Sequence, residues 1–156
     1  MQLKKLDPSF YTENIHLQEA LDLIDGQWTN CKIRGHGIVC ISINHLTFAI
    51  PLRSNITHDG AYLTLRKSRE TPMNKGLDFS KALLITKQEY ISNEVFKIPR
   101  QEHEKLKDKA HFITQSFEKY VERYVFAIQK SDRNILAGSG YRFTTLRNYH
   151  AELGLI

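Results

Sequence analysis

Apolar and polar residues follow two different periods along the chain, and these periods predict the secondary structure. Residues 37–55, GIVCISINHLTFAIPLRSN, hold two apolar runs joined by the polar pair Asn44-His45. This pattern predicts two antiparallel strands with a two-residue hairpin turn. Alternating or short apolar runs predict three further strands, at residues 61–66, 81–86 and 95–98, the last ending at Pro99.

Other apolar residues recur every three or four positions, the spacing of one face of a helix. This spacing predicts a helix within residues 14–26, a long amphipathic helix over 106–128, and a last helix around 143–149 that ends before Gly154. Strands come first and helices later, so the expected fold is α+β. We expect a compact, mostly antiparallel twisted sheet surrounded by helices.

Length and composition predict one globular domain spanning residues 1–156, with 41% apolar and 25% charged residues. No apolar run approaches the roughly 20 residues of a membrane span, and the N-terminus has no hydrophobic signal core. The two cysteines form neither a disulfide framework nor a paired metal motif, and Cys40, inside an apolar run, is expected to be buried. We therefore expect a cytoplasmic protein without membrane partners.

The net charge of +5 favours an anionic partner, and the cations gather in two polar segments, RSNITHDG and RKSRETPMNKG. Arginine can fork onto phosphate oxygens while hydroxyls donate beside it, so both segments suit phosphate contact as well as simple solvation. Arg53 differs from the others because it follows Pro51, which must sit at a strand end or edge. A rigid element should therefore present its guanidinium.

Familiar catalytic motifs are missing from the sequence. The seven histidines show no metal-binding spacing, and the chain has no phosphate-binding loop, no dinucleotide fingerprint and no GxSxG elbow. We expect no metal and no cofactor. The remaining Arg, Lys, Ser, Tyr and His side chains suit RNA cleavage, because RNA carries its own nucleophile. A 2′-hydroxyl in line with phosphorus needs a base, an acid and positive charge in the transition state.

Five segments carry a resemblance: FYTENI, KIRGHGIVCISINHLTFAIPLRS, GLDFSKALLI, the helix over 117–128, and FTTLRNYHAEL. In this order, over nearly the whole chain, they resemble the ToxN/AbiQ-type endoribonuclease toxins of type III toxin–antitoxin systems, most of all the TenpN branch. The resemblance implies a partial barrel related to MazF/Kid-type toxins. It implies a toxin active in phage defence by abortive infection, which cuts cellular or phage RNA without a metal and leaves a 2′,3′-cyclic phosphate. It also implies inhibition by a small repetitive pseudoknot RNA in a closed toxin–RNA hetero-oligomer.

The resemblance also carries over individual residues. It assigns catalytic roles to Tyr11, to Arg34 before the first core strand, and to Ser54 in a Pro-Leu-Arg-Ser segment where the family has Pro-Leu-Thr-Ser. Arg53 replaces the family threonine, and the lysine expected two residues beyond the serine is Ile56. Arginine is a poor acid or base, so His58 or His36 is a candidate for proton transfer.

The remaining polar residues of these segments are candidate RNA contacts: His36, Asn55, Lys67, Arg69, Lys75, Lys81 and Arg142. Some of these assignments have structural alternatives, since Tyr11 also suits a core position and Lys81 an exposed strand position. If residues 34–36 and 53–55 lie at one end of the hairpin, Arg34, Arg53 and Ser54 should converge on one phosphate. A non-catalytic RNA-binding module with the same basic groove is the alternative function.

Overall fold

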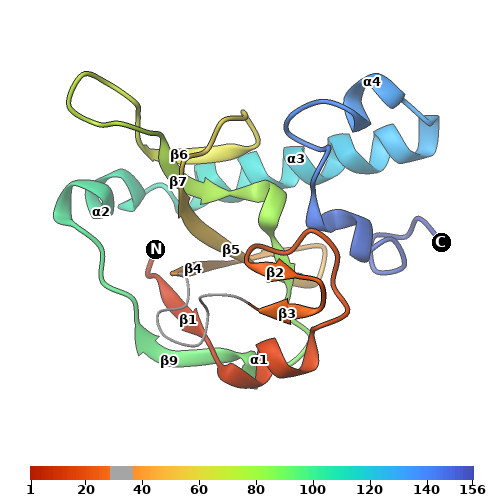
Figure 1. Ribbon diagram of the computed structural model, residues 1–156, viewed down its shortest axis with the longest axis horizontal. Coiled ribbons are helices and arrows are strands. Elements are labelled where there is room, and N and C mark those ends of the chain that lie inside the picture. The colour runs from red at the N-terminus through yellow and green to blue at the C-terminus, as the bar shows by residue number, and fades with distance from the viewer. Residues whose placement is uncertain (29–36) are drawn as a thin grey trace.

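A computed structural model describes residues 1–28 and 37–156 of the chain (Figure 1). An antiparallel sheet runs in the order β6-β7-β5-β4-β1-β9, with β8 also paired to β5. The strands are β1 (Lys4–Leu6), β4 (Ile38–Ile43), β5 (Leu46–Ser54), β6 (Ala61–Leu65), β7 (Lys75–Asp78), β8 (Leu83–Leu84) and β9 (Ile91–Val95). The sheet has two free ends, β6 and β9, so it is open rather than closed into a barrel.

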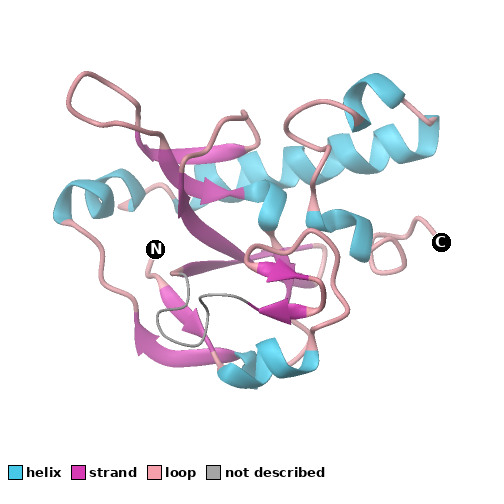
Figure 2. Cartoon of the chain, in the orientation of Figure 1, coloured by secondary structure: helices cyan, strands magenta, loops and turns pink. Residues whose placement is uncertain are grey.

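Helices lie around this sheet, as the cyan elements of Figure 2 show. In the described part of the chain they are the α-helices α1 (Pro8–Glu13), α2 (Arg100–Leu106), α3 (Ala110–Lys130) and α4 (Arg133–Leu136), with the 3-10 helices η1 (Phe79–Lys81), η2 (Gln88–Tyr90) and η3 (Thr145–Asn148). The expected α+β fold with a mostly antiparallel sheet is confirmed. None of the described helices combines the length and apolar character that crossing a bilayer requires.

The β4–β5 hairpin forms as predicted and organises the sheet. Asn44 and His45 both have positive φ, 47° and 67°, as a type I′ turn requires. The β5 strand then changes partner along one edge, from β8 at residues 48–49 to β7 at 52–54. Pro51, which has no N–H to donate, occupies the interval between these two pairings.

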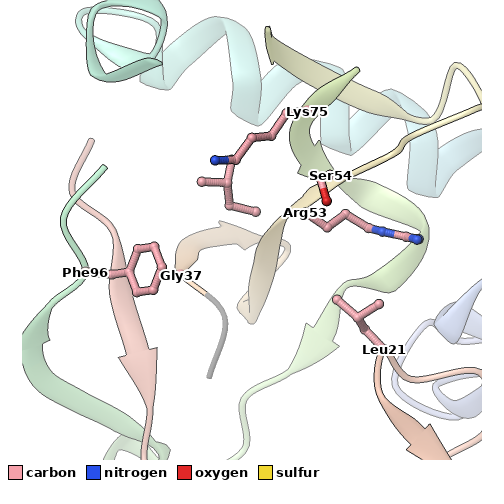
Figure 3. A pocket seen from close by; sticks show the side chains of 7 residues that line it. Leu21, Gly37, Arg53, Ser54, Lys75 and Phe96 are labelled. Carbon is pink, nitrogen blue, oxygen red and sulfur yellow. The ribbon is translucent and has the colours of Figure 1, made fainter. Parts of the chain in front are cut away.

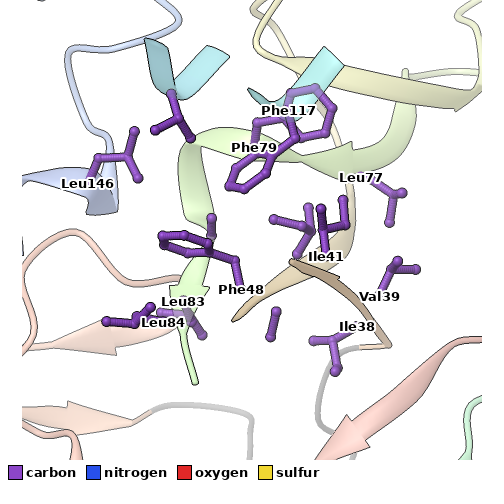
Figure 4. Packing of buried hydrophobic residues seen from close by; sticks show 14 of the residues in the cluster. Ile38, Val39, Ile41, Phe48, Leu77, Phe79, Leu83, Leu84, Phe117 and Leu146 are labelled. Atoms are coloured by element: carbon purple, nitrogen blue, oxygen red, sulfur yellow. The ribbon is translucent and has the colours of Figure 1, made fainter. Parts of the chain in front are cut away.

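The long helix α3 packs its apolar face against the sheet, confirming the amphipathic pattern (Figure 4). Phe117, fully buried, contacts Phe48 of β5 and Phe79 of η1, with ring centroids 5.3 and 5.4 Å apart. The predicted helix began at residue 106, but the chain breaks at Asp108, whose φ of 58° separates α2 from α3. The core therefore joins the sheet, η1 and α3 into one body.

The helix predicted within residues 14–26 is wrong. A short hairpin replaces its second half, with β2 (Leu23–Ile24) and β3 (Gln27–Trp28) joined by Asp25-Gly26. Both turn residues have positive φ, 52° and 75°, so the Asp-Gly signal of a two-residue turn overrode the helical spacing. Leu17 and Ala20 are still buried, which explains why the apolar spacing was misleading.

Several other boundaries differ from those predicted. The strand expected at 95–98 lies earlier, in β9, and the strand expected at 81–86 shrinks to β8 because η1 occupies its start. The last helix is only the short η3, and Phe143, predicted to lie on its apolar face, is 52% exposed. Cys40 is exposed, not buried, because it lies on the outer face of β4 between inward-facing Val39 and Ile41.

Candidate functional site

A buried carboxylate, Asp78, organises the polar groups at the end of β5. Its side chain is fully buried at the end of β7, where it caps η1 by accepting a hydrogen bond from the Ser80 backbone N–H. The Arg53 guanidinium lies 3.0 Å from one carboxylate oxygen, and the Ser80 hydroxyl donates to the other at 2.6 Å. The His58 Nε2 atom lies 3.2 Å from that second oxygen. Asp78 therefore joins two predicted site residues, Arg53 and His58.

The hydrogen bonds of His58 determine which nitrogen carries its proton. Its Nδ1 atom accepts a hydrogen bond from the Gly60 backbone N–H at 3.0 Å. The proton of the neutral ring therefore sits on Nε2, which donates toward Asp78 and lies 3.3 Å from the Ser80 hydroxyl. Both ring nitrogens have partners inside the protein, so proton transfer by His58 would require one of these contacts to break.

Opposing effects set the pKa of Asp78. Burial alone raises it, but hydrogen bonds from His58 and Ser80, together with the nearby charge of Arg53, outweigh burial and hold the pKa below its ordinary value. The carboxylate therefore stays ionised at neutral pH and fixes the orientation of the Arg53 side chain, which is 29% exposed.

A pocket of about 380 Å³ lies beside this network, lined in part by Arg53, Ser54 and Lys75 (Figure 3). Ser54 pairs with Lys75 across β5 and β7, so the two side chains share a face of the sheet. Arg53, the preceding residue of the strand, leaves on the opposite face. Figure 3 shows the Arg53 guanidinium and the Lys75 amine pointing away from each other. Ser54 and Lys75 are thus cross-strand neighbours, whereas the Arg53 guanidinium is turned toward Asp78.

Lys75 has its own buried partner. Its amine lies 3.2 Å from the carboxylate of Glu102 on α2, which is 1% exposed and also accepts a hydrogen bond from the Thr64 hydroxyl at 3.1 Å. Each cation of the pocket is therefore held by a buried carboxylate. Such cations are positioned in advance of any ligand, although part of their charge is balanced.

Lys81 is half-buried in η1, not exposed on a strand. Its amine donates to the backbone oxygens of Glu19, at 2.7 Å, and Phe143, at 2.9 Å. Burial is the largest influence and lowers the pKa of this amine; Glu19 and Asp78 oppose that shift. Lys81 thus connects η1 to two distant segments, one of which carries the predicted RNA contact Arg142.

Other predicted residues lie apart from this cluster. Tyr11 is on α1, which Figure 1 places at the far end of the sheet from β6 and β7, and its ring packs edge-on against Trp28 at 5.1 Å. Asn55, Lys67 and Arg69 are exposed in the loops that follow β5 and β6. The Arg142 guanidinium stacks over the Phe143 ring at 4.9 Å.

Arg34 and His36 lie within residues 29–36, outside the described residues. The predicted convergence of Arg34 with Arg53 and Ser54 therefore stays a prediction. The described part agrees with the expected register, because the Leu52 N–H donates to the Gly37 carbonyl at 2.8 Å. Gly37 therefore lies beside the end of β5.

Sequence reasoning missed Asp78, Ser80 and Glu102. A signal for the first two was present, because an Asp two residues before a Ser inside the apolar run GLDFSKALL suggests a helix cap rather than a strand residue. Glu102 had no comparable signal, since its burial depends on how α2 packs against β6.

Comparisons with known proteins found no match: no protein-family model, no curated protein and no solved structure matches the chain. Within the residues that the structure describes, no group of three or more His, Cys, Asp or Glu side chains is arranged to hold a metal ion. The sequence resemblance and the geometry at the end of β5 are therefore the two indications of function.

Proposed function

We propose that the protein is an endoribonuclease toxin of a type III toxin–antitoxin system, held inactive by a small repetitive RNA. The observation that carries the proposal is the position of the family-like segment Pro51–Ser54. It ends β5 beside a pocket that is lined by both Ser54 and its cross-strand partner Lys75. A relation of the open sheet to the barrel of MazF/Kid-type toxins belongs to the same proposal.

The proposed reaction needs no nucleophile from the protein. The 2′-oxygen of the substrate loses its proton and bonds to the adjacent phosphorus, while the bond to the 5′-oxygen breaks and that oxygen gains a proton. The products are a 2′,3′-cyclic phosphate and a 5′-hydroxyl end. In this proposal Ser54 and Lys75, which line the same pocket, contact the non-bridging phosphate oxygens, where negative charge increases. His58 and His36 remain the candidates for proton transfer, and Tyr11 and Arg34 keep the catalytic roles that the resemblance implies.

A specific observation supports the alternative, a non-catalytic RNA-binding module. Both nitrogens of His58 are engaged, and the charges of Arg53 and Lys75 are matched by Asp78 and Glu102. Such an arrangement can bind phosphate without transferring a proton. The two functions differ in one measurable property, the formation of a cyclic phosphate end.

Cleavage of a defined RNA by the purified protein tests the proposal. We expect Glu102→Gln to cleave at least as well as wild type, because Lys75 keeps its charge and loses its counter-ion. The double variant Lys75→Met/Glu102→Gln removes the cation without leaving a buried unpaired carboxylate. Loss of such a donor costs about a hundredfold in rate. Ser54→Ala, at an exposed hydroxyl, should cost about tenfold, since a neutral hydrogen bond contributes about 1 kcal/mol.

Lys130→Ala, at an exposed position on α3, is the matched control for a change of net charge. Equal cleavage by Glu102→Gln and by the double variant would contradict the role of Lys75. Binding of RNA without any cyclic phosphate product, by correctly folded wild-type protein, would favour the binding module.

Expression in a bacterial host tests the toxin assignment separately. We expect the chain alone to halt growth by cutting RNA, and co-expression of its repeat RNA to restore growth. Growth equal to that of an empty vector, with soluble protein verified, would count against a toxin. Short tandem repeats upstream of the gene would identify the RNA to co-express.

A further inference from the structure

A second pocket, of about 470 Å³, lies between α3, α4, the turn before β6 and the loop 138–140. Its lining differs completely from that of the pocket at the end of β5. Polar and charged groups make up the larger part of its lining, beside the rings of Phe79, Tyr120 and Tyr141. Its volume lies in the range of sites for small ligands.

Two cations stand on one side of this pocket. Lys119 and Arg123 are four residues apart on α3, so their side chains leave the same face of the helix one turn apart. Both are exposed. The Ser116 hydroxyl, which also lines the pocket, already donates to the Phe112 carbonyl at 2.9 Å, so the two cations are the groups that suit a phosphate.

Hydrogen bonds tie the loop 138–140 and Tyr141 to α3. The Tyr120 hydroxyl donates to the Gly140 carbonyl at 2.6 Å, and the Tyr141 hydroxyl donates to the Tyr120 carbonyl at 2.8 Å. The two tyrosine rings stack, with centroids 4.5 Å apart. A Cβ added at Gly140 would lie 3.2 Å from an Asp59 carboxylate oxygen, so the loop 138–140 packs closely beside Asp59. The pocket is therefore formed before any ligand binds.

Asp59 gives this pocket a preference among bases. A carboxylate only accepts hydrogen bonds, and guanine is the one RNA base with two adjacent N–H donors on its Watson–Crick edge. Adenine, cytosine and uracil each place an acceptor beside their donor, which a carboxylate repels. The rim thus offers a phosphate contact on α3 and a guanine contact at Asp59.

We infer that this pocket binds a guanosine nucleotide unit of single-stranded RNA, with phosphate at Lys119 and Arg123 and the base edge at Asp59. The choice of RNA as the ligand rests on the proposed function. The pocket would hold a nucleotide away from the reaction site, so it would select RNA sequence without taking part in cleavage.

Binding of guanosine 5′-monophosphate to the full chain, measured by titration calorimetry, tests this inference without any cleavage step. We expect Arg123→Ala to weaken binding about tenfold or more, since a charge-assisted contact is lost. Lys130→Ala on the same helix should bind like wild type. Asp59→Asn should remove the preference for guanosine over adenosine monophosphate, because an amide donates as well as accepts.

Three results would overturn the inference. The first is that wild type does not bind guanosine monophosphate at millimolar concentration. The second is that Arg123→Ala and wild type bind it with equal affinity. The third is that wild type binds guanosine and adenosine monophosphate with equal affinity. Loss of nucleotide binding in Ser54→Ala, with Arg123→Ala unaffected, would also overturn it by placing the ligand in the other pocket. Nucleotide binding by a protein that cleaves no RNA would contradict the proposed function alone.

Discussion

Asp78 shows how one buried residue controls the stability of the candidate site. It holds Arg53, His58 and Ser80 together, and removal of one partner from a buried ion pair leaves the other charge uncompensated. The ion pair predicts that Arg53→Ala loses stability, so the cleavage rate of this variant must be corrected for the folded fraction.

We expect Asp78→Asn to lower the free energy of unfolding at pH 7 by about 2–4 kcal/mol, below the upper range for buried pairs because Arg53 is partly exposed. The pKa of Asp78 is lowered in the folded state, so its contribution is present above the ordinary value of 3.8 and is lost as the pH falls through the lower folded-state pKa. Urea unfolding of both proteins from pH 7 to pH 3 should show their difference shrinking at the acid end.

The exposed carboxylate of Asp59 provides the control for this measurement. Asp59→Asn should unfold like wild type across the same range of pH. A difference between wild type and Asp78→Asn that stays constant down to pH 3 would mean that the carboxylate charge does not stabilise the fold.

Among the secondary-structure elements, the β4–β5 hairpin carries the candidate site, and its turn contains measurable strain. His45 is exposed with φ at 67°, a conformation that costs a residue with a Cβ about 1 kcal/mol or more. His45→Gly should therefore raise the free energy of unfolding by about 0.5–1 kcal/mol, while His45→Ala keeps the strain and should change little. Equal stability of the Gly and Ala variants in thermal or urea unfolding would contradict the strained turn.

The elements also show what sequence could and could not predict. The hairpin at Asn44-His45 and the long helix α3 were predictable because turn chemistry and apolar period agree there. In residues 14–26 they disagree, and the Asp25-Gly26 turn prevailed over the helical spacing. Of the site, the position of Arg53 and Ser54 at the end of β5 was predictable, but the buried carboxylates were not. Asp78 reaches Arg53, and Glu102 reaches Lys75, through long-range packing, which leaves no local period in the sequence.

On the scale of the whole molecule, the positive charge favours an anionic partner, as the proposed RNA would be. The net charge is +5, and exposed cations lie in the loop between β6 and β7 as well as on α3. Phosphate contacts release counter-ions, so RNA affinity should fall steeply as salt rises, with a log–log slope of about −0.7 for each phosphate contacted on a single strand.

The slope distinguishes local contacts from the effect of net charge. Lys67→Ala and Arg69→Ala should each make the slope shallower by about 0.7, if each cation contacts one phosphate. Lys130→Ala removes the same charge from the far end of α3 and should leave the slope unchanged. Fluorescence anisotropy of a labelled RNA at several salt concentrations measures the RNA affinity, and so the slope, of wild type and the three variants.

Equal slopes for the loop variants and wild type would mean that the β6–β7 loop is solvated surface. The phosphate contacts would then have to come from the pockets themselves, where Lys75 and Arg123 are the cations to vary next.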